Sequence, residues 1–244
     1  MKYTYSQIVQ SLPMKKNSKS SLWVKLIARK ISFIFTFIFI NLGFSPWTVS
    51  LLSALVSLVG SLSLCINSPY FRVVGIVFIN LWLILDCVDG NIARVKKQSS
   101  EMGEFIDALS GYYVTGFAYL SIGVSAFYTT SMSSIPPTWF IILGGISSVS
   151  GLLARIIHQK YTYSLLMLND SKNKYFNNEQ TYKRNNLNYL RERIDKELNI
   201  SGLFMPFLIV SAIFNLYDIM TIFYLILQLG GLFIVTLYYS IKAR

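Results

Sequence analysis

Long apolar segments constrain the fold of this chain more than any other feature of its sequence. Lipid offers no hydrogen-bond partners to the backbone, so a segment that crosses it must satisfy its own N–H and C=O groups, as a helix does. A helix needs about 20 apolar residues to cross about 30 Å of hydrocarbon. We assign six such segments, at residues 47–66, 73–92, 105–127, 139–157, 203–216 and 219–241. The sequence therefore predicts an all-α fold, a polytopic membrane helical bundle with six transmembrane helices.

The remaining segments are shorter or more polar. Residues 31–42 are mostly apolar and follow Lys25, Arg29 and Lys30, a length and flank that favour an interfacial helix. No small-residue cleavage site follows them, so we expect no cleaved signal peptide. We divide the chain into a cytoplasmic N-terminal segment with this interfacial helix, residues 1–44, and a six-helix membrane domain, residues 45–244. Residues 160–199, rich in Asn and Lys, form its cytoplasmic connector.

Basic residues indicate the topology of the predicted bundle. If the N-terminus is cytoplasmic, every Lys and Arg except Arg72 lies on the cytoplasmic side, as the positive-inside rule requires. We expect a multi-pass protein, in a bacterial plasma membrane, whose active site faces the cytoplasm. The formal net charge of +11 lies mostly in these cytoplasmic segments, where lipid headgroups are a sufficient partner for it. We therefore expect the lipid bilayer, and no nucleic acid, as a partner.

A cluster of acidic residues interrupts the second apolar segment. Asp86 directly follows the apolar run 79–85, where an ionisable side chain costs about 2.5 to 3.5 kcal/mol on insertion scales. At about 100° per residue, Asp86, Asp89, Gly90, Ala93 and Arg94 share one stripe of a helix. The carboxylates offer hard oxygen ligands, the small residues allow a phosphate to approach, and the guanidinium binds phosphate bidentately. The stripe predicts a phosphate site with a cation.

The next predicted helix carries a second stripe. Gly103, Asp107 and Gly111 recur at four-residue spacing, so they lie on one face. The small residues allow close packing, and Asp107 is placed to complete an ion site with Asp86 and Asp89. We considered an ion transporter with these carboxylates, but all three lie near one membrane face and no interrupted helix pair marks a midplane site.

The spacing of these residues resembles the signature of the CDP-alcohol phosphotransferase (CDP-alcohol phosphatidyltransferase) family. That signature reads D-x-x-D-G-x-x-A-R-x8-G-x-x-x-D-x-x-x-D, and seven of its eight fixed positions match here. They are Asp86, Asp89, Gly90, Ala93, Arg94, Gly103 and Asp107. The resemblance implies that Asp86, Asp89 and Asp107 hold one or two divalent cations, Mg²⁺ or Mn²⁺. It further implies a nucleotide pocket at Gly90, Ala93, Arg94 and Gly103, and a homodimer.

The resemblance also implies an activity. A metal-dependent membrane transferase would move a phospho-alcohol or phosphatidyl group from a CDP-linked donor to a hydroxyl acceptor and release CMP. Such a reaction belongs to lipid or envelope-glycan synthesis. The metal would stabilise the charge that develops on the phosphoryl group and on the leaving CMP.

Gly111 departs from the signature, because the family has its proposed general base, an aspartate, at this position. Three hypotheses follow. Another residue supplies the base, with Asp107, Glu104, Tyr112 and His158 as candidates; the acceptor is already ionised; or the protein is a catalytically silent relative that binds a CDP-linked lipid or partners a membrane enzyme. Loss of a general base costs about 10²- to 10⁴-fold in rate, while donor and metal binding survive.

Arg155 ends the fourth apolar segment, about one helical turn before His158. It has two interpretations. Its guanidinium binds an anionic acceptor or a lipid headgroup, or it extends to the interface and anchors the topology.

Overall fold

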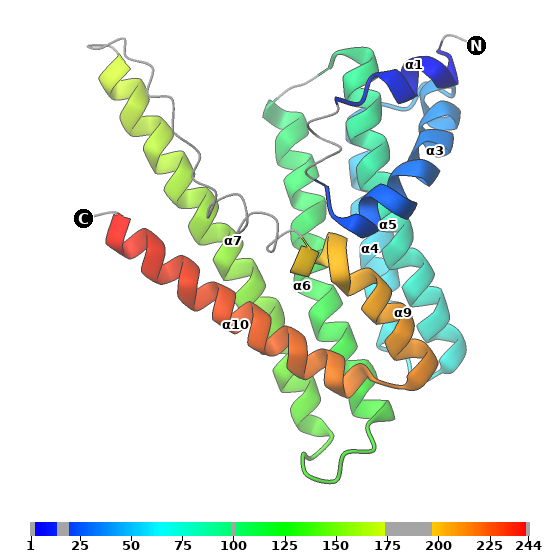
Figure 1. The fold of residues 1–244 in the computed structure, drawn as a ribbon, viewed down its shortest axis with the longest axis vertical. Helices are drawn as coiled ribbons and strands as arrows, with labels where there is room; N and C mark the ends of the chain where they lie inside the picture. The colour runs from blue at the N-terminus through cyan, green and yellow to red at the C-terminus, as the bar shows by residue number, and fades with distance from the viewer. Residues whose placement is uncertain (1–2, 14–19, 99–100, 174–196, 243–244) are drawn as a thin grey trace.

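The computed structural model describes residues 3–13, 20–98, 101–173 and 197–242 (Figure 1). Every element in this part of the chain is helical, which confirms the predicted all-α class. The α-helices are α1 (Tyr5–Gln10), α3 (Arg29–Asn41), α4 (Pro46–Leu64), α5 (Pro69–Lys96), α6 (Glu101–Thr129), α7 (Thr138–Asn173), α9 (Met205–Phe214) and α10 (Tyr217–Lys242), with π-helical turns η1 (Val24–Ala28) before α3 and η2 (Ile200–Phe204) before α9.

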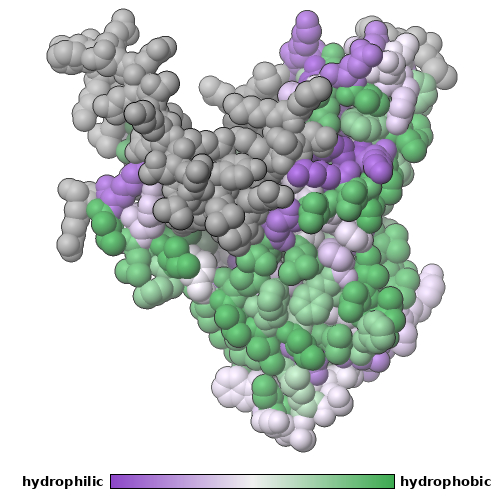
Figure 2. Space-filling view, viewed as in Figure 1, coloured by the Kyte–Doolittle hydropathy of each residue, from purple (hydrophilic) through white to green (hydrophobic). Residues whose placement is uncertain are grey.

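Four helices are long and apolar enough to cross a membrane: α4, α5, α7 over Thr138–Leu165, and α10. Helix α6 has 29 residues but is not one of these four. The η2 and α9 segment, Ile200–Phe214, is a shorter apolar helix. Hydrophobic side chains cover the part of the surface over α9 and the start of α10, and hydrophilic ones gather near α1 (Figure 2). The chain is therefore built as an integral membrane protein, and the count of six spans stays a prediction.

Helix α3 occupies the segment for which we predicted an interfacial helix. Its buried residues are Arg29, Ser32, Thr36 and Ile40, at a spacing of three or four. The inward stripe is thus mostly polar, while the outward Ile34 is 55% exposed. A helix that shows its apolar face outward suits contact with lipid. Its position relative to a membrane interface stays a prediction.

Local sequence signals fix several helix ends. The Ser45 side chain accepts a hydrogen bond from the backbone of Thr48, and Pro46 opens α4, as N-cap and first-turn positions favour. Pro206 lies in the first turn of α9, where its missing N–H leaves no bond unmade. The chain bends just before it, at Gly202, whose backbone is non-helical. Pro206 therefore does not interrupt the hydrogen bonds inside α9, and no neighbouring helix has to replace them.

Helix packing places α4 between α5 and α6, and α7 and α10 cross beside α6 (Figure 1). Glycines permit the closest approach, between α6 and α7. A Cβ on Gly144 would lie 2.8 Å from the carbonyl oxygen of Tyr119 and 3.0 Å from Cα of Gly123. Small residues at a crossing let two backbones touch, as in many membrane helix pairs. This contact fixes where α7 stands against α6.

The predicted connector, residues 160–199, falls partly outside the described residues. Its first part continues α7 to Asn173, and residues 174–196 are not described. At its end, both carboxylate oxygens of Glu197 accept hydrogen bonds from the backbone N–H of Leu22, at 3.1 Å. Ser21 likewise donates to the carbonyl of Ser201 at 2.6 Å. The segment before α9 is thus attached to the residues just before η1.

The glycine contact between α6 and α7 predicts a selective loss of stability. Gly144→Ala forces two backbones apart, so we expect its free energy of unfolding to fall by about 1 to 3 kcal/mol. Gly145→Ala is the matched control, because a Cβ there meets only Cδ1 of Leu120, at 3.9 Å. Thermal unfolding of both variants in the same detergent measures the difference. Equal melting temperatures would show that this crossing is not tight.

Candidate functional site

Asp89 is the most deeply placed carboxylate of the acidic cluster. It lies on α5, is 4% exposed, and accepts a hydrogen bond of 2.5 Å from the Ser50 hydroxyl on α4. Asp86 and Asp107 both act on it electrostatically, so the helices bring the three predicted carboxylates within range of one another. Asp86 is half-buried and Asp107 exposed. The cluster therefore runs from the interior of the bundle to its surface.

The chemistry of this cluster fits a hard divalent cation. Carboxylates that interact beside apolar helices need a positive charge or protons to neutralise them, and oxygen donors are the ligands of Mg²⁺ and Mn²⁺. Within the described ranges, however, no three His, Cys, Asp or Glu side chains stand close enough to form a ready-made metal site. A cation would have to draw these side chains together, and the assignment of metal ligands stays a prediction.

Serines of α4 fix the spacing of the two acidic helices. The hydroxyls of Ser53 and Ser110 share a hydrogen bond of 2.7 Å, and Ser110 also accepts one of 2.7 Å from Nε1 of Trp82. This chain of contacts links α5, α4 and α6 just beneath the carboxylates. Sequence reasoning missed these residues, although Ser50, Ser53 and Ser57 recur at helical spacing within an apolar segment.

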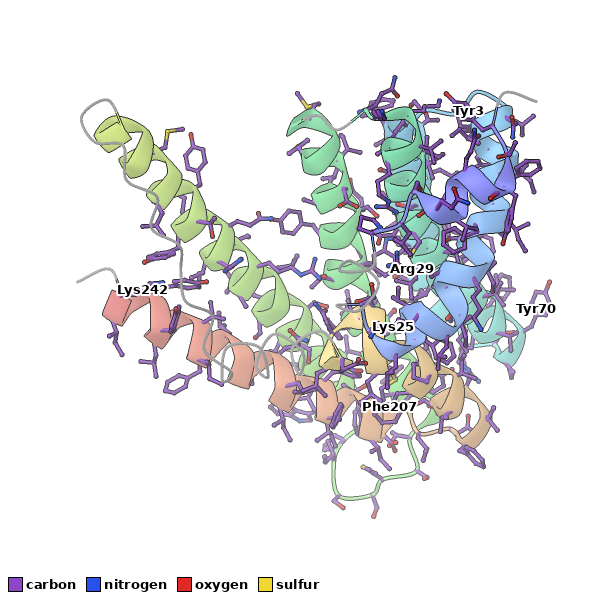
Figure 3. The ribbon with its side chains drawn as sticks, turned by 45° about the horizontal axis from the view of Figure 1, so that its top comes forward. Tyr3, Lys25, Arg29, Tyr70, Phe207 and Lys242 are labelled. Atoms are coloured by element: carbon purple, nitrogen blue, oxygen red, sulfur yellow. The ribbon has the colours of Figure 1, made fainter. Side chains whose placement is uncertain are left out.

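Two arginines lie close together where α3 meets α5. Arg94, half-buried on α5, donates 2.5 Å to Oδ1 of Asn91, and the Asn91 amide donates to the hydroxyls of Ser32 and Thr36 on α3. Arg29, at the start of α3 (Figure 3), is 6% exposed and interacts electrostatically with Arg94. The inward polar stripe of α3 therefore serves to hold Arg94.

Both guanidinium groups have an N–H donor available for a ligand. The Nε atoms of Arg29 and Arg94 are buried and have no hydrogen-bond partner in the described part of the chain. Like charges that lie together with unsatisfied donors fit an anion such as phosphate. The sequence placed Arg94 in such a site, but counted Arg29 only as part of the positive charge. The signal was its position three residues before Ser32, on the same face of the helix as the polar stripe.

Arg155 occupies the space beside Gly111. A Cβ built on Gly111 would lie 2.9 Å from Nη1 of Arg155. A guanidinium from α7 thus stands where an aspartate side chain at position 111 would project from α6. The departure from the signature is therefore a replacement of negative by positive charge, one helical turn from Asp107.

The remaining predicted residues are distributed as follows. Gly90 and Ala93 are half-buried on α5, and Gly103 is half-buried on α6. The Nδ1 atom of the exposed His158 shares a hydrogen bond with the Tyr239 hydroxyl of α10, and the Tyr112 hydroxyl donates to Gln159 of α7. The two candidate bases, His158 and Tyr112, thus form their hydrogen bonds with α10 and α7, respectively. The side chain of Glu104 falls outside the described part.

The comparison with known proteins points to one family. A family model for CDP-alcohol phosphatidyltransferase matches residues 27–174, more than half of the chain. The match covers α3 to α7, and with them the acidic cluster, both arginines of the α3 and α5 contact, Gly111 and Arg155. No curated protein sequence matches the chain.

The bond between Ser50 and Asp89 predicts a second difference in stability. Ser50→Ala leaves a buried carboxylate without this donor, so we expect a loss of about 1 to 3 kcal/mol in the free energy of unfolding. Ser57→Ala is the matched control: Ser57 is equally buried on α4, but donates only to the carbonyl of Ala54 in its own helix. Thermal unfolding in detergent without divalent cations is the measurement. A Ser57→Ala loss as large as that of Ser50→Ala would contradict the assignment.

Proposed function

The chain belongs to the CDP-alcohol phosphatidyltransferase family, and we propose that it moves a phospho-alcohol or phosphatidyl group from a CDP-linked donor to a hydroxyl acceptor. CMP is the leaving group, and the product belongs to lipid or envelope-glycan synthesis. The observation that supports the proposal is the buried Asp89 on α5, whose carboxylate the charges of Asp86 and of Asp107 on α6 both act on. A divalent cation that neutralises these charges would also hold the donor diphosphate.

The donor side of the proposed site combines carboxylates with arginines. Asp86, Asp89 and Asp107 would hold Mg²⁺ or Mn²⁺, which would supply positive charge to the donor diphosphate and to the leaving CMP. Gly90, Ala93 and Gly103 leave room for the nucleotide. Arg94 and the previously unassigned Arg29 offer N–H donors to the phosphate oxygens, supported by their unsatisfied Nε atoms.

The acceptor side must remove a proton from the attacking hydroxyl. The acceptor oxygen forms the new bond to phosphorus, the bond to CMP breaks, and the hydroxyl proton passes to a base. A guanidinium cannot serve as that base, because it stays charged, but it stabilises negative charge on the acceptor. We assign proton removal to Asp107, one turn from Gly111, with Glu104 and His158 as the alternatives, and acceptor binding to Arg155.

The orientation and assembly are also proposed. Basic residues at the ends of α5 and α10 support a cytoplasmic active site in a bacterial plasma membrane. The family implies a homodimer. The broad apolar surface of α10, on which Phe233 is 66% exposed and Ile241 73%, suits contact with lipid or with a second copy.

Catalytic silence is the second hypothesis, and Gly111 favours it. The family's base position holds no side chain here, and a guanidinium stands beside it. In that case the chain would bind a CDP-linked lipid, or act as a membrane partner protein, without turnover. Donor binding is expected under both hypotheses, so only CMP release separates them.

The proposed activity predicts the effect of neutralising each carboxylate. With CDP-alcohols or CDP-diacylglycerol as donors, we expect metal-dependent CMP release that falls at least about 100-fold in Asp86→Asn, Asp89→Asn and Asp107→Asn, because each loses a charge at the diphosphate. Asp218→Asn is the control, since this buried carboxylate pairs with Thr130 on another part of the bundle. Equal CMP release by the wild type and all three variants would contradict the assignment of these carboxylates to the active site.

Position 111 separates the two hypotheses. An aspartate there lies against Arg155, and the resulting ion pair occupies the guanidinium. If the wild type is active, we expect Gly111→Asp to lower CMP release, and Gly111→Asp with Arg155→Gln to isolate the effect of the new carboxylate from that of the pair. If the wild type is inactive and Gly111→Asp creates release, the natural protein is silent and its binding machinery intact.

A further inference from the structure

A cavity of about 990 Å³ lies between α6, α7 and α10, and Leu198 and Asn199 close one side of it. Its volume is at the upper end of small-molecule sites. The residues that line it include none of Asp86, Asp89 and Asp107. It is therefore a separate space from the carboxylate cluster.

The walls of this cavity differ in polarity. On the α6 and α7 side stand Thr115, Tyr119 and Arg155, and the Tyr119 hydroxyl accepts a hydrogen bond of 2.8 Å from Gln228. Arg155 is the one Lys or Arg among the described lining residues, which include no Asp or Glu. This side of the cavity therefore favours an anionic and hydrogen-bonding group.

The α10 side is mainly apolar and opens outward. Leu227, Ile234 and Val235 line it, and Ile234 is 55% exposed. Only 17% of the most apolar stretch of α10 is buried, so its outer surface is apolar and exposed, as a surface suited to lipid contact is. The cavity thus connects a polar inner wall to the hydrocarbon, the environment that an amphiphile needs.

Aromatic contacts hold α7 and α10 together at the end of the cavity. The Tyr161 and Tyr239 rings lie 4.3 Å apart, and Tyr239 also bonds to His158. Lys242 (Figure 3), near the end of α10, lies 5.9 Å from the centre of the Tyr161 ring. The two helices that form the cavity are therefore fixed to each other, and the space is formed in advance of binding.

Arg155 joins this cavity to the candidate site. The same guanidinium lines the cavity and lies 2.9 Å from the position of a Cβ on Gly111. A side chain at position 111 would meet it and compete for its donors. The glycine therefore leaves room for Arg155 to serve a ligand in the cavity, at a position one helical turn from Asp107 on α6.

We propose that the cavity binds the acceptor, and that the acceptor is an anionic lipid alcohol. Its apolar chain lies along α10, its anionic group meets Arg155, and its free hydroxyl points past Gly111 toward the carboxylates. The proposal rests on the transferase function above and deepens it by placing lipid on the acceptor. Gly111 is then a specificity-determining residue.

The test uses a 1-acyl-glycerol 3-phosphate with a photoreactive diazirine in its acyl chain, because it carries the chain, the anion and the hydroxyl. The full-length protein in lipid nanodiscs is illuminated, and labelled residues are mapped by mass spectrometry. Gly231→Phe fills the cavity, whereas Gly230→Phe is the matched control. A Cβ on either glycine meets no atom within 4 Å, but only Gly231 lines the cavity.

We expect labels on Leu227 and Val235 in wild type and Gly230→Phe, and a fall of about tenfold or more in Gly231→Phe, where the bound chain has no room. Arg155→Gln should weaken the same labels, while those on the outward Phe233 stay constant. Equal labelling of the cavity residues in both glycine variants would overturn the proposal. So would the failure of unlabelled lipid to compete in the wild type, a result that does not depend on either variant folding.

The result also separates this inference from the transferase function. CMP release with glycerol 3-phosphate, together with no CMP release and no cavity labelling with the lipid, would leave the function standing and remove the lipid acceptor. Specific labelling of the cavity without CMP release from any donor would support the lipid site and remove the transferase.

Discussion

The burial of the Asp89 carboxylate is the constraint on which the site depends. A carboxylate at 4% exposure among apolar helices is stable only with hydrogen bonds and compensating charge. Ser50 supplies one bond, and the small residues of α4 let α5 and α6 approach from either side. The two further carboxylates add to its electrostatic load instead of relieving it. The bundle thus gathers negative charge at this point, and we propose that a cation neutralises it.

Positive charge is arranged around this centre on three helices. Arg94 and Arg29 stand on the side where α3 meets α5, and Arg155 stands on the α7 side, over Gly111. In the proposed site, a diphosphate with its cation would lie between the carboxylates and the first pair, and Arg155 would serve a second substrate. Under that proposal, glycine in place of the family's aspartate alters the acceptor side of the site and not the donor side.

The sequence predicted the helices well, because apolar length and periodicity are local signals. Helical spacing also determines that Asp86 and Asp89 lie near one face of α5, whereas their grouping with Asp107 on α6 as metal ligands stays a prediction. The sequence did not reveal Ser50, Arg29 or the cavity, because these depend on which helices become neighbours. The polar stripe of α3 was visible as Ser32 and Thr36, but only its contact with Asn91 gives it a purpose. From the sequence, Gly111 indicated only that the family's aspartate is missing. The position of the Arg155 guanidinium beside it depends on how α7 packs against α6, which the sequence does not reveal.

The central claim is that the carboxylate cluster binds a CDP group through a divalent cation. Calorimetric titration of CDP into the purified protein, first with Mg²⁺ and then with a chelator, tests it most directly, because it requires neither a known acceptor nor turnover. The account predicts saturable binding with Mg²⁺ that is lost in the chelator. Equal binding in both conditions, or none in either, would contradict it.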